Sequence, residues 1–152
     1  MSTLHYTLIR NTSELDAHQQ WLPAIFAIHK QLRPQTMTDV AAYETLLRTM
    51  LGENQQILLA HNGEPPFVGL AMFNIHHNTY QNKMLFLEDF VIDEAQRGTQ
   101  VGSTILAEIE RLARENGCEH VGLDSGVHRP RAHKFYFTHG YIAESFHFVK
   151  PL

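Results

Sequence analysis

Hydrophobic and polar side chains recur along this chain with two periods, and the period changes several times. Residues 4–10 alternate between apolar and polar positions, which predicts a strand with one polar face. Apolar residues at three- and four-residue spacing over residues 40–51 and 101–113 predict helices with one buried side. The complete pattern predicts strands over residues 4–10, 56–61, 67–75, 84–92, 120–123 and 141–149, and helices after Asn11, around Pro23, and over 40–51, 101–116 and 132–139.

Turn and capping residues set the ends of these elements. Asp39 is a candidate N-cap, and Pro23 predicts either the start of a second helix or a kink in the first. Asn62–Gly63 is a hairpin signal, Gly52 is expected to end a helix, and residues 74–83 are polar enough to predict a loop or frayed strand ends. Three antiparallel strands before a strand–helix–strand unit predict a mixed α/β (α+β) fold, with a mixed, mostly antiparallel sheet and helices on both faces.

Composition and charge restrict the class of protein and its partners. At 152 residues and 43% hydrophobic content, the chain is long enough for one domain with a real core, residues 1–152. The net charge is −4 without a Lys/Arg cluster, which argues against nucleic-acid binding, and no apolar run reaches the length of a membrane span. With Cys118 as the only cysteine and no signal-peptide pattern in the first ten residues, a cytoplasmic protein is expected. The eleven histidines are scattered without an H-E-x-x-H motif, so no metal site is expected.

The most informative stretch is residues 96–104, Gln-Arg-Gly-Thr-Gln-Val-Gly-Ser-Thr, between a predicted strand and a predicted helix. Gly98 and Gly102 allow positive φ and let a ligand approach the backbone. Amides at a helix start favour an anion, and Arg97 adds a cation whose planar fork suits phosphate oxygens. The alternative is an ordinary strand–turn–helix connection. Neither the Walker motif nor the G-x-G-x-x-G fingerprint is present.

This loop resembles the pyrophosphate loop of the GNAT acetyltransferase superfamily, R/Q-x-x-G-x-G/A. Arg97 and Gly102 fit that pattern, whereas Gln100 stands where the family commonly has glycine, which leaves the backbone dihedral there open. Residues 129–141 resemble a second family pattern, A-x-x-F/L-Y-x-x-x-G-F/Y, with Tyr136 on its tyrosine. Within the superfamily, the chain looks most like the aminoalkylphosphonate N-acetyltransferases and related small-amine enzymes.

The resemblance implies acetyl-CoA as co-substrate and a set of residues that bind it. The backbone of residues 90–92 would run beside the pantetheine arm as a further strand does, and one of its amides would donate to the oxyanion. Residues 97–103 would hold the pyrophosphate, and Arg129 and Arg131 would approach the cofactor or be solvated surface charges. The implied cofactor-binding residues are Phe90, Val91, Ile92, Arg97, Gly98, Thr99, Gln100, Val101, Gly102, Ser103 and Arg129.

Acetyl transfer to an amine needs a base for the amine and an acid for the leaving thiolate. The resemblance implies that Tyr136 is this acid; the alternative is a core tyrosine. Glu88 and Asp89 are candidate bases on one predicted strand, where alternation would place them on opposite faces and apolar surroundings would raise the pKa. One of them is expected to face solvent or pair with a cation, and Glu88 ranks ahead of Asp89. The remaining candidates are His76, His77 and His133.

The predicted function is therefore acetylation of the primary amine of a small molecule, by direct attack in a ternary complex. A non-catalytic acyl-CoA sensor on the same fold is an alternative, supported by Gln100, and an acetyltransferase for protein amines is another. The resemblance also implies a homodimer, by analogy with relatives. Cys118 lies just after the helix-ending Gly117 and is interpreted as structural rather than nucleophilic.

Overall fold

A computed structural model describes residues 3–152, and the chain divides into a first compact unit that ends at Gly122 and a second that begins at Leu123. Each unit is described by itself. The helices and strands are β1 (His5–Ile9), α1 (Thr12–Ala17), α2 (Leu22–Lys30), α3 (Val40–Gly52), β2 (Gln56–His61), β3 (Gly69–Asn78), β4 (Asn82–Ile92), α4 (Val101–Glu115), β5 (His120–Leu123) and α5 (Pro130–Thr138), with 3₁₀ turns at Gln19–Trp21 and Glu94–Gln96.

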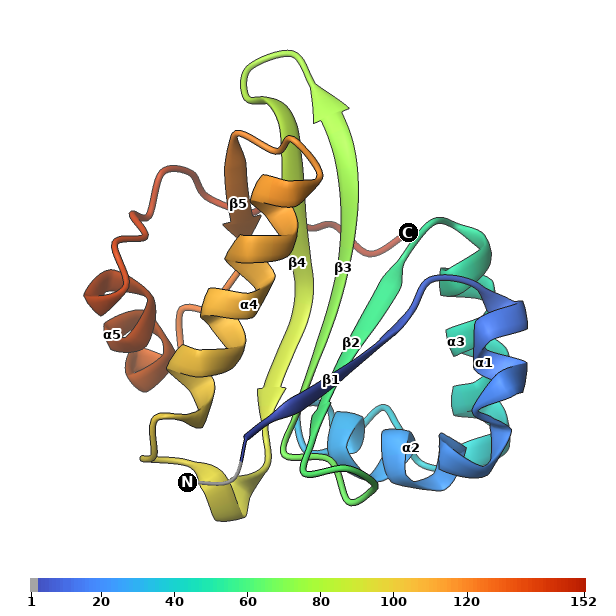
Figure 1. The fold of residues 1–152 in the computed structure, drawn as a ribbon. Coiled ribbons are helices and arrows are strands. Elements are labelled where there is room, and N and C mark those ends of the chain that lie inside the picture. The colour runs from blue at the N-terminus through green and yellow to red at the C-terminus, as the bar shows by residue number, and fades with distance from the viewer. Residues whose placement is uncertain (1–2) are drawn as a thin grey trace. The chain divides into compact units, whose positions relative to one another are not determined.

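The sheet of the first unit has five strands in the order β1-β2-β3-β4-β5, and the pairs β1–β2, β2–β3 and β3–β4 are antiparallel (Figure 1). This order and the flanking helices confirm the predicted fold class. The prediction for residues 74–83 was wrong, because β3 and β4 continue through most of this polar stretch and pair as far as Asn78 and Asn82. The turn between them is closed by the Asn78 side chain, whose Oδ1 accepts from the amide of Gln81 at 2.7 Å.

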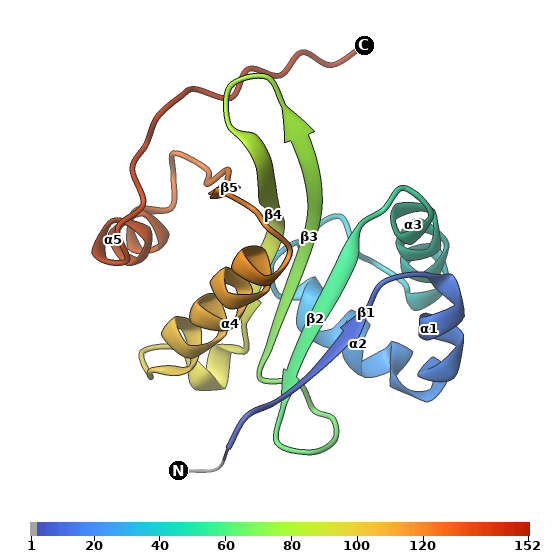
Figure 2. The ribbon, with the colours of Figure 1, turned by 45° about the horizontal axis from the view of Figure 1, so that its top comes forward.

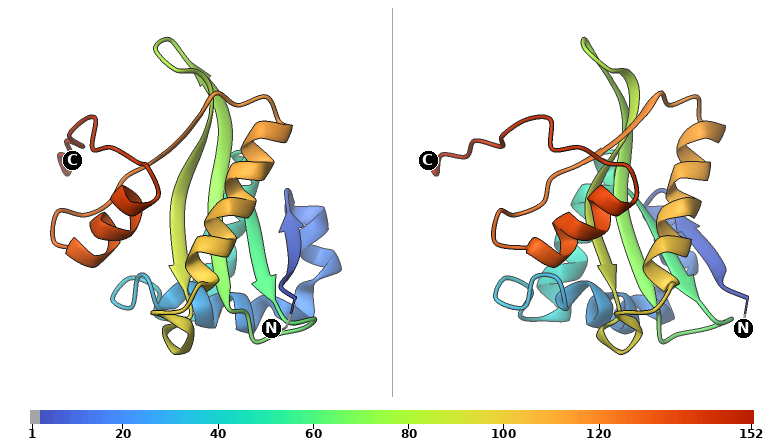
Figure 3. Two further views of the ribbon diagram at one scale, coloured as in Figure 1. Left: turned by 60° about the vertical axis from the view of Figure 1, so that its left-hand side comes forward. Right: turned by 90° about the vertical axis from the view of Figure 1, so that its left-hand side faces the viewer.

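The two faces of this sheet are covered by different helices. A core cluster joins side chains of α1, α2 and α3 to one face, including Ile25, Leu47 and Met72. Helix α4 covers the other face, where Ile105 lies directly over Gly69 of β3. Figures 2 and 3 show α4 on one side of the strands and α1 to α3 on the other.

Local signals explain where the helices begin and end. Asn11 and Asp39 cap α1 and α3 by accepting from the amides of Glu14 and Ala42, each at 2.9 Å. Pro23 lies in the first turn of α2, so it starts a second helix rather than kinking the first. The residue with left-handed backbone after α3 is Asn54, at φ 67°, while Gly52 is the last residue of the helix.

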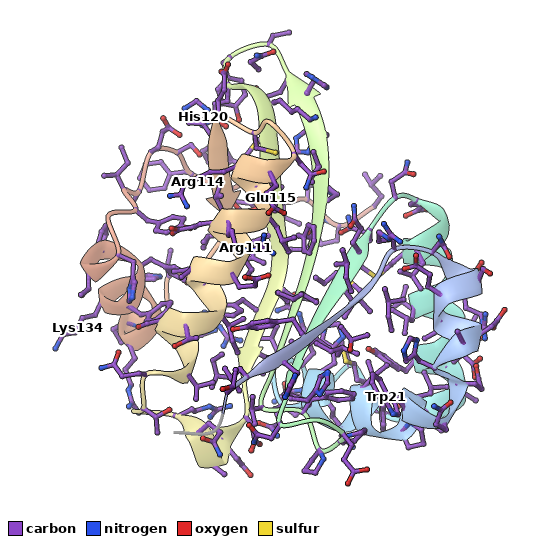
Figure 4. All side chains as sticks on the ribbon, in the orientation of Figure 1. Trp21, Arg111, Arg114, Glu115, His120 and Lys134 are labelled. Atoms are coloured by element: carbon purple, nitrogen blue, oxygen red, sulfur yellow. The ribbon has the colours of Figure 1, made fainter. Side chains whose placement is uncertain are left out.

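Helix α4 separates an apolar from a charged side, as its spacing predicts. Ile105, Leu106 and Ile109 are buried, whereas Arg111 and Arg114 form ion pairs with acidic residues one turn away (Figure 4). Such exposed pairs contribute little to stability, so burial of the apolar stripe is what holds α4 in place. Among residues 3–152, no helix combines the length and the apolar character needed to cross a membrane.

In the second unit, α5 is followed by a segment without strand pairing. The alternation over residues 141–149 predicted a final strand, and this prediction was wrong for the structure described. A strand exists only when a neighbouring strand accepts and donates its backbone hydrogen bonds, and none does so here among the described residues. The apolar residues of this segment, such as Phe146 and Phe148, are exposed.

Candidate functional site

The centre of the candidate site is an irregularity in β4. Met72 of β3 pairs with Asp89, but the next residue, Phe73, pairs with Leu87, so Glu88 has no partner in β3. Such a β-bulge interrupts the alternation of side chains, and bulges are common beside active sites. The prediction that Glu88 and Asp89 simply alternate across the sheet therefore does not describe this part of β4.

Asp89 faces helices α2 and α3, where a buried histidine binds it. Its pairing partner Met72 belongs to the core on that side, and Oδ2 of Asp89 lies 2.8 Å from Nε2 of His29. Since a carboxylate only accepts, Nε2 carries the proton, and Nδ1 of a neutral His29 accepts from the hydroxyl of Tyr43 at 2.8 Å. The side chain of His29 is only 2% exposed, so this chain of hydrogen bonds fixes Asp89 from the interior.

Arg33, just beyond α2, binds the other oxygen of Asp89. The distance between a terminal guanidinium nitrogen and Oδ1 is 2.8 Å. Burial alone would raise the pKa of Asp89, but the hydrogen bond from His29 and the guanidinium of Arg33 lower it below its ordinary value. Asp89 is thus held as an anion with both oxygens engaged, whereas Glu88 is exposed and its side chain makes no hydrogen bond or ion pair within residues 3–152.

The same end of α2 also contacts the residues that follow β4. Gln31 donates from Nε2 to Oδ1 of Asp93 at 2.9 Å, and its Oε1 accepts from the amide of Glu94 at 2.9 Å. Residues 90–92 therefore lie between two attachments to α2, one at Asp89 and one at Asp93 and Glu94. These attachments hold the stretch that the resemblance assigns to the pantetheine arm.

Residues 90–92 pair with β3 on one side, where Val91 is opposite Leu70. The contacts that join β5 to β4 lie toward the other end of β4, where the amide of Glu119 donates to the carbonyl of Lys83 at 2.8 Å. Val91 is buried in the core, while Phe90 and Ile92 are half-buried.

The predicted phosphate loop follows and leads into α4. Gly98 has φ 80°, and a Cβ there would meet nothing within 4 Å. Gln100 has φ −80° and ψ 0°, an ordinary conformation, so glycine is not required where the family commonly has it. Gly102 is the second residue of α4 and is helical, not left-handed. The N-cap residue Gln100 makes no side-chain capping bond, as is also the case at the starts of α2 and α5, and Oγ1 of Thr99 accepts from the amide of Val101 at 3.3 Å.

Arg97 and the remaining loop residues are accessible. Residues 97–100 are exposed and residues 101–103 half-buried, and Nε of Arg97 donates to the carbonyl of Ile92 at 3.3 Å. This contact bends Arg97 back toward the end of β4 and leaves its terminal nitrogens available to phosphate oxygens. The donor set of the loop, amides and one guanidinium, therefore fits the pyrophosphate of CoA.

The second unit contains the predicted acid. Tyr136 is half-buried in α5, and its ring contacts those of Phe135 and Tyr141. Burial raises the pKa of Tyr136 to about 12, against the opposing charge of Arg129. The hydroxyl is therefore protonated at neutral pH, as a proton donor must be. Arg129 itself is the N-cap residue of α5.

The other candidate residues have local partners. His133 hydrogen-bonds the carbonyl of Gly126 at 2.8 Å, and His76 hydrogen-bonds Asn74 at 2.6 Å near the exposed end of the β3–β4 hairpin, where His77 is also exposed. Burial raises the pKa of the Cys118 thiol, which keeps it protonated and unreactive.

The sequence patterns did not point to His29, Arg33 or Tyr43. His29 and Tyr43 lie on the buried sides of α2 and α3 among apolar residues at helical spacing. That position was a signal, because a polar side chain on a buried helix face needs a hydrogen-bond partner. Neither Arg33 nor the bulge at Glu88 has a comparable signal in the sequence, since both depend on the pairing of β4 with its neighbours.

Comparisons with known proteins agree with this geometry. The profile of the Acetyltransferase (GNAT) family matches residues 17–141. Aminoalkylphosphonate N-acetyltransferase of Salmonella typhimurium is 30% identical over 132 residues, which cover 85% of this chain and 84% of that protein. Aminoglycoside N(6')-acetyltransferase type 1 of Stenotrophomonas maltophilia is 28% identical over 76% of this chain and 78% of its own length.

A solved structure extends the likeness to the fold. AAC(6')-Iy in complex with the bisubstrate analogue CoA-S-monomethyl-acetylneamine has a TM-score of 0.74 at 18% identity and covers 99% of both chains. The family profile includes the parts that carry the predicted cofactor-binding residues, which are β4, the loop that leads into α4, and the start of helix α5. The chain therefore belongs to the GNAT family of acetyltransferases, and it is an N-acetyltransferase that uses acetyl-CoA as its co-substrate.

Proposed function

We propose that the protein transfers the acetyl group of acetyl-CoA directly to the primary amine of a small molecule in a ternary complex. The observation that carries this proposal is the bulge at Glu88, because it presents an exposed, unpaired carboxylate two residues before the strand stretch 90–92. The relative from Salmonella typhimurium, named for an aminoalkylphosphonate acceptor, supports a small amine as substrate.

Glu88 is our candidate for the group that takes the proton from the acceptor's ammonium, directly or through water. Asp89 is less suited to this task, because His29 and Arg33 occupy both of its oxygens and lower its pKa. A carboxylate whose charged form is already stabilised has little tendency to take up a proton. We therefore assign Asp89 to positioning and Glu88 to proton transfer.

Tyr136 is our candidate for the general acid. In the reaction, the amine nitrogen bonds to the acetyl carbonyl carbon, the carbon–sulfur bond breaks, and the departing thiolate takes a proton. A hydroxyl with a pKa of about 12 holds that proton at neutral pH until the thiolate forms. Amides of residues 90–92 would stabilise the oxyanion, and residues 97–103 with Arg129 would bind the donor.

Both units belong to this one activity in our proposal, and the chain acts as a single domain. The support is that the family profile extends across the boundary at Gly122.

We also propose that the protein works in the reducing cytoplasm as a homodimer. Exposed apolar side chains in residues 142–152 support self-association, and the oligomeric mass in solution tests it.

Calorimetry with acetyl-CoA, followed in the same sample by free-thiol release on addition of mixed small amines, tests the activity. Binding followed by thiol release is the expected result. Release with peptides but not with small amines would point to a protein acceptor. Binding without release from either would favour a sensor, although the ordinary backbone of Gln100 removes the sequence feature that supported one.

A further inference from the structure

Arg33 differs from an ordinary surface arginine because Asp89 holds it in place. The guanidinium donates to Oδ1 of Asp89 at 2.8 Å, and this carboxylate is only 12% exposed. Asp89 is fixed in turn through Oδ2 by buried His29, which is bound to Tyr43. Helices α2 and α3 and strand β4 therefore all contribute to the orientation of one guanidinium group.

Most of the hydrogen-bonding capacity of Arg33 remains available. Its side chain is 47% exposed, and Asp89 is its only ion-pair partner within residues 3–152. A guanidinium has five N–H donors in a rigid fork, and that fork matches the oxygens of a carboxylate, phosphate or phosphonate. An arginine that is oriented before its ligand arrives loses less side-chain freedom on binding.

Two residues of opposite charge adjoin Asp89, one in the chain and one by an ion pair. Glu88, the preceding residue, is exposed and unpaired, while Arg33 is bound to Asp89 from the end of α2. A ligand with an ammonium group and an anionic group could satisfy both at once, with its nitrogen toward Glu88 and its anion on the guanidinium. An amine without an anionic group, such as propylamine, could satisfy only Glu88 through its ammonium.

We propose that Arg33 is a binding site for an anionic group on the acceptor, so that the preferred substrates are small amines with a phosphonate or carboxylate a few bonds from the nitrogen. This inference rests on the proposed function, because it refines the acceptor of the same reaction. Arg33 is a specificity-determining residue in this scheme and takes no part in proton transfer.

The test compares kcat/KM for 2-aminoethylphosphonate, β-alanine and propylamine in the wild type, Arg33→Gln and Arg33→Lys. We expect the wild type to prefer both anionic amines. Arg33→Gln should lower kcat/KM for them by about 10- to 100-fold, mostly through KM, because a hydrogen bond to a charged group is lost. Turnover of propylamine, which has no anionic group, should fall much less. Lysine should restore part of the preference, because it keeps the charge but not the fork.

Arg111→Gln is the matched control. Arg111 is 50% exposed and also bound by carboxylates, those of Glu108 and Glu115, but it lies on the outer side of α4 (Figure 4). This variant should behave as the wild type with all three amines, and thermal unfolding should confirm that each variant is folded.

The outcomes separate the inference from the proposed function. An equal loss of kcat/KM for amines with and without an anionic group in Arg33→Gln would mean that Arg33 has a structural role, and it would overturn the inference. A wild type that does not prefer amines with an anionic group would overturn it too. Either result leaves amine acetylation standing. Absence of thiol release with every amine would overturn the proposed function and the inference together.

Discussion

Nε2 of His29 and Oδ2 of Asp89 lie 2.8 Å apart, and this contact joins the covering helix α2 to the bulge in β4. It requires Nε2 to carry the proton, so the neutral ring relies on the hydroxyl of Tyr43 at Nδ1. Three elements thus meet through one buried imidazole, beside the carboxylate that we assign to proton transfer.

Tyr43→Phe tests how much this hydrogen-bond network contributes to stability. The variant keeps the ring but leaves Nδ1 of His29 buried without a donor, so the free energy of unfolding should fall by about 1–3 kcal/mol. Urea unfolding measures it. Tyr80→Phe is the control, because Tyr80 is 78% exposed and its loss should change stability by no more than about 0.5 kcal/mol. Equal effects from both substitutions would mean that the Tyr43 hydroxyl contributes nothing.

Tyr136→Phe should lower kcat by about 100-fold or more, while the Kd of acetyl-CoA changes little. In our proposal the hydroxyl supplies a proton only as the thiolate leaves, so its loss should affect the reaction rather than binding of the donor. Thiol-release kinetics and calorimetry measure the two quantities. Unchanged kcat would remove the acid role. Because the pKa of Tyr136 is about 12, its deprotonation should produce no decline in rate at any pH below about 11.

Gly98→Ala should weaken acetyl-CoA binding by about tenfold or more. Alanine has open space there, but at φ 80° it costs about 1–2 kcal/mol of backbone strain, which the loop can relieve only by leaving its conformation. Gly63→Ala is the matched control: Gly63 has φ 116° and equally open space, in the hairpin between β2 and β3. Both variants should lose stability, but only Gly98→Ala should lose affinity. An equal Kd of acetyl-CoA in Gly98→Ala and Gly63→Ala would show that the loop does not bind the donor.

Gly69→Ala should destabilise the protein by about 1–3 kcal/mol, because the added Cβ would clash with Cδ1 of Ile105 in α4. Ile105→Val removes that carbon and by itself costs about 0.5–1.5 kcal/mol. The double variant should therefore lose less stability than the two single variants lose together. Strict additivity in a double-mutant cycle would contradict the contact between β3 and α4.

His61 should make stability depend on pH in the weakly acidic range. It is 5% exposed beside Trp21, and burial, then the charge of His5, lower its pKa below the ordinary 6.5. The unfolded chain then binds the proton more tightly, so this contribution is complete above about pH 6.5 and is lost as the pH falls through the folded pKa.

The corresponding variant is His61→Gln, which removes the titration. The slope of the unfolding free energy against pH, measured between about pH 6.5 and 5, should decrease by up to about 1.4 kcal/mol per pH unit. An unchanged slope in His61→Gln would mean that this histidine binds protons equally in both states.

The sequence by itself determined the elements whose signals are local. Alternation, capping by Asn11 and Asp39, and the position of Pro23 depend on neighbours a few residues away, and β2, β5 and α4 appear within a residue of where the pattern predicted them. The predicted phosphate loop and the candidate acid Tyr136 could also be picked out, because the family motifs that carry them are contiguous in the chain.

Only the tertiary structure decided which side chains meet. The bulge at Glu88 arises from the pairing of β4 with β3, and the contacts of Asp89 with His29 and Arg33 join residues about 60 and 56 positions apart in the chain. The alternation over residues 141–149 predicted a strand, but no neighbouring strand pairs with this segment among the described residues. Hydrogen bonds between distant segments depend on register and packing, and a one-dimensional pattern does not contain either of them.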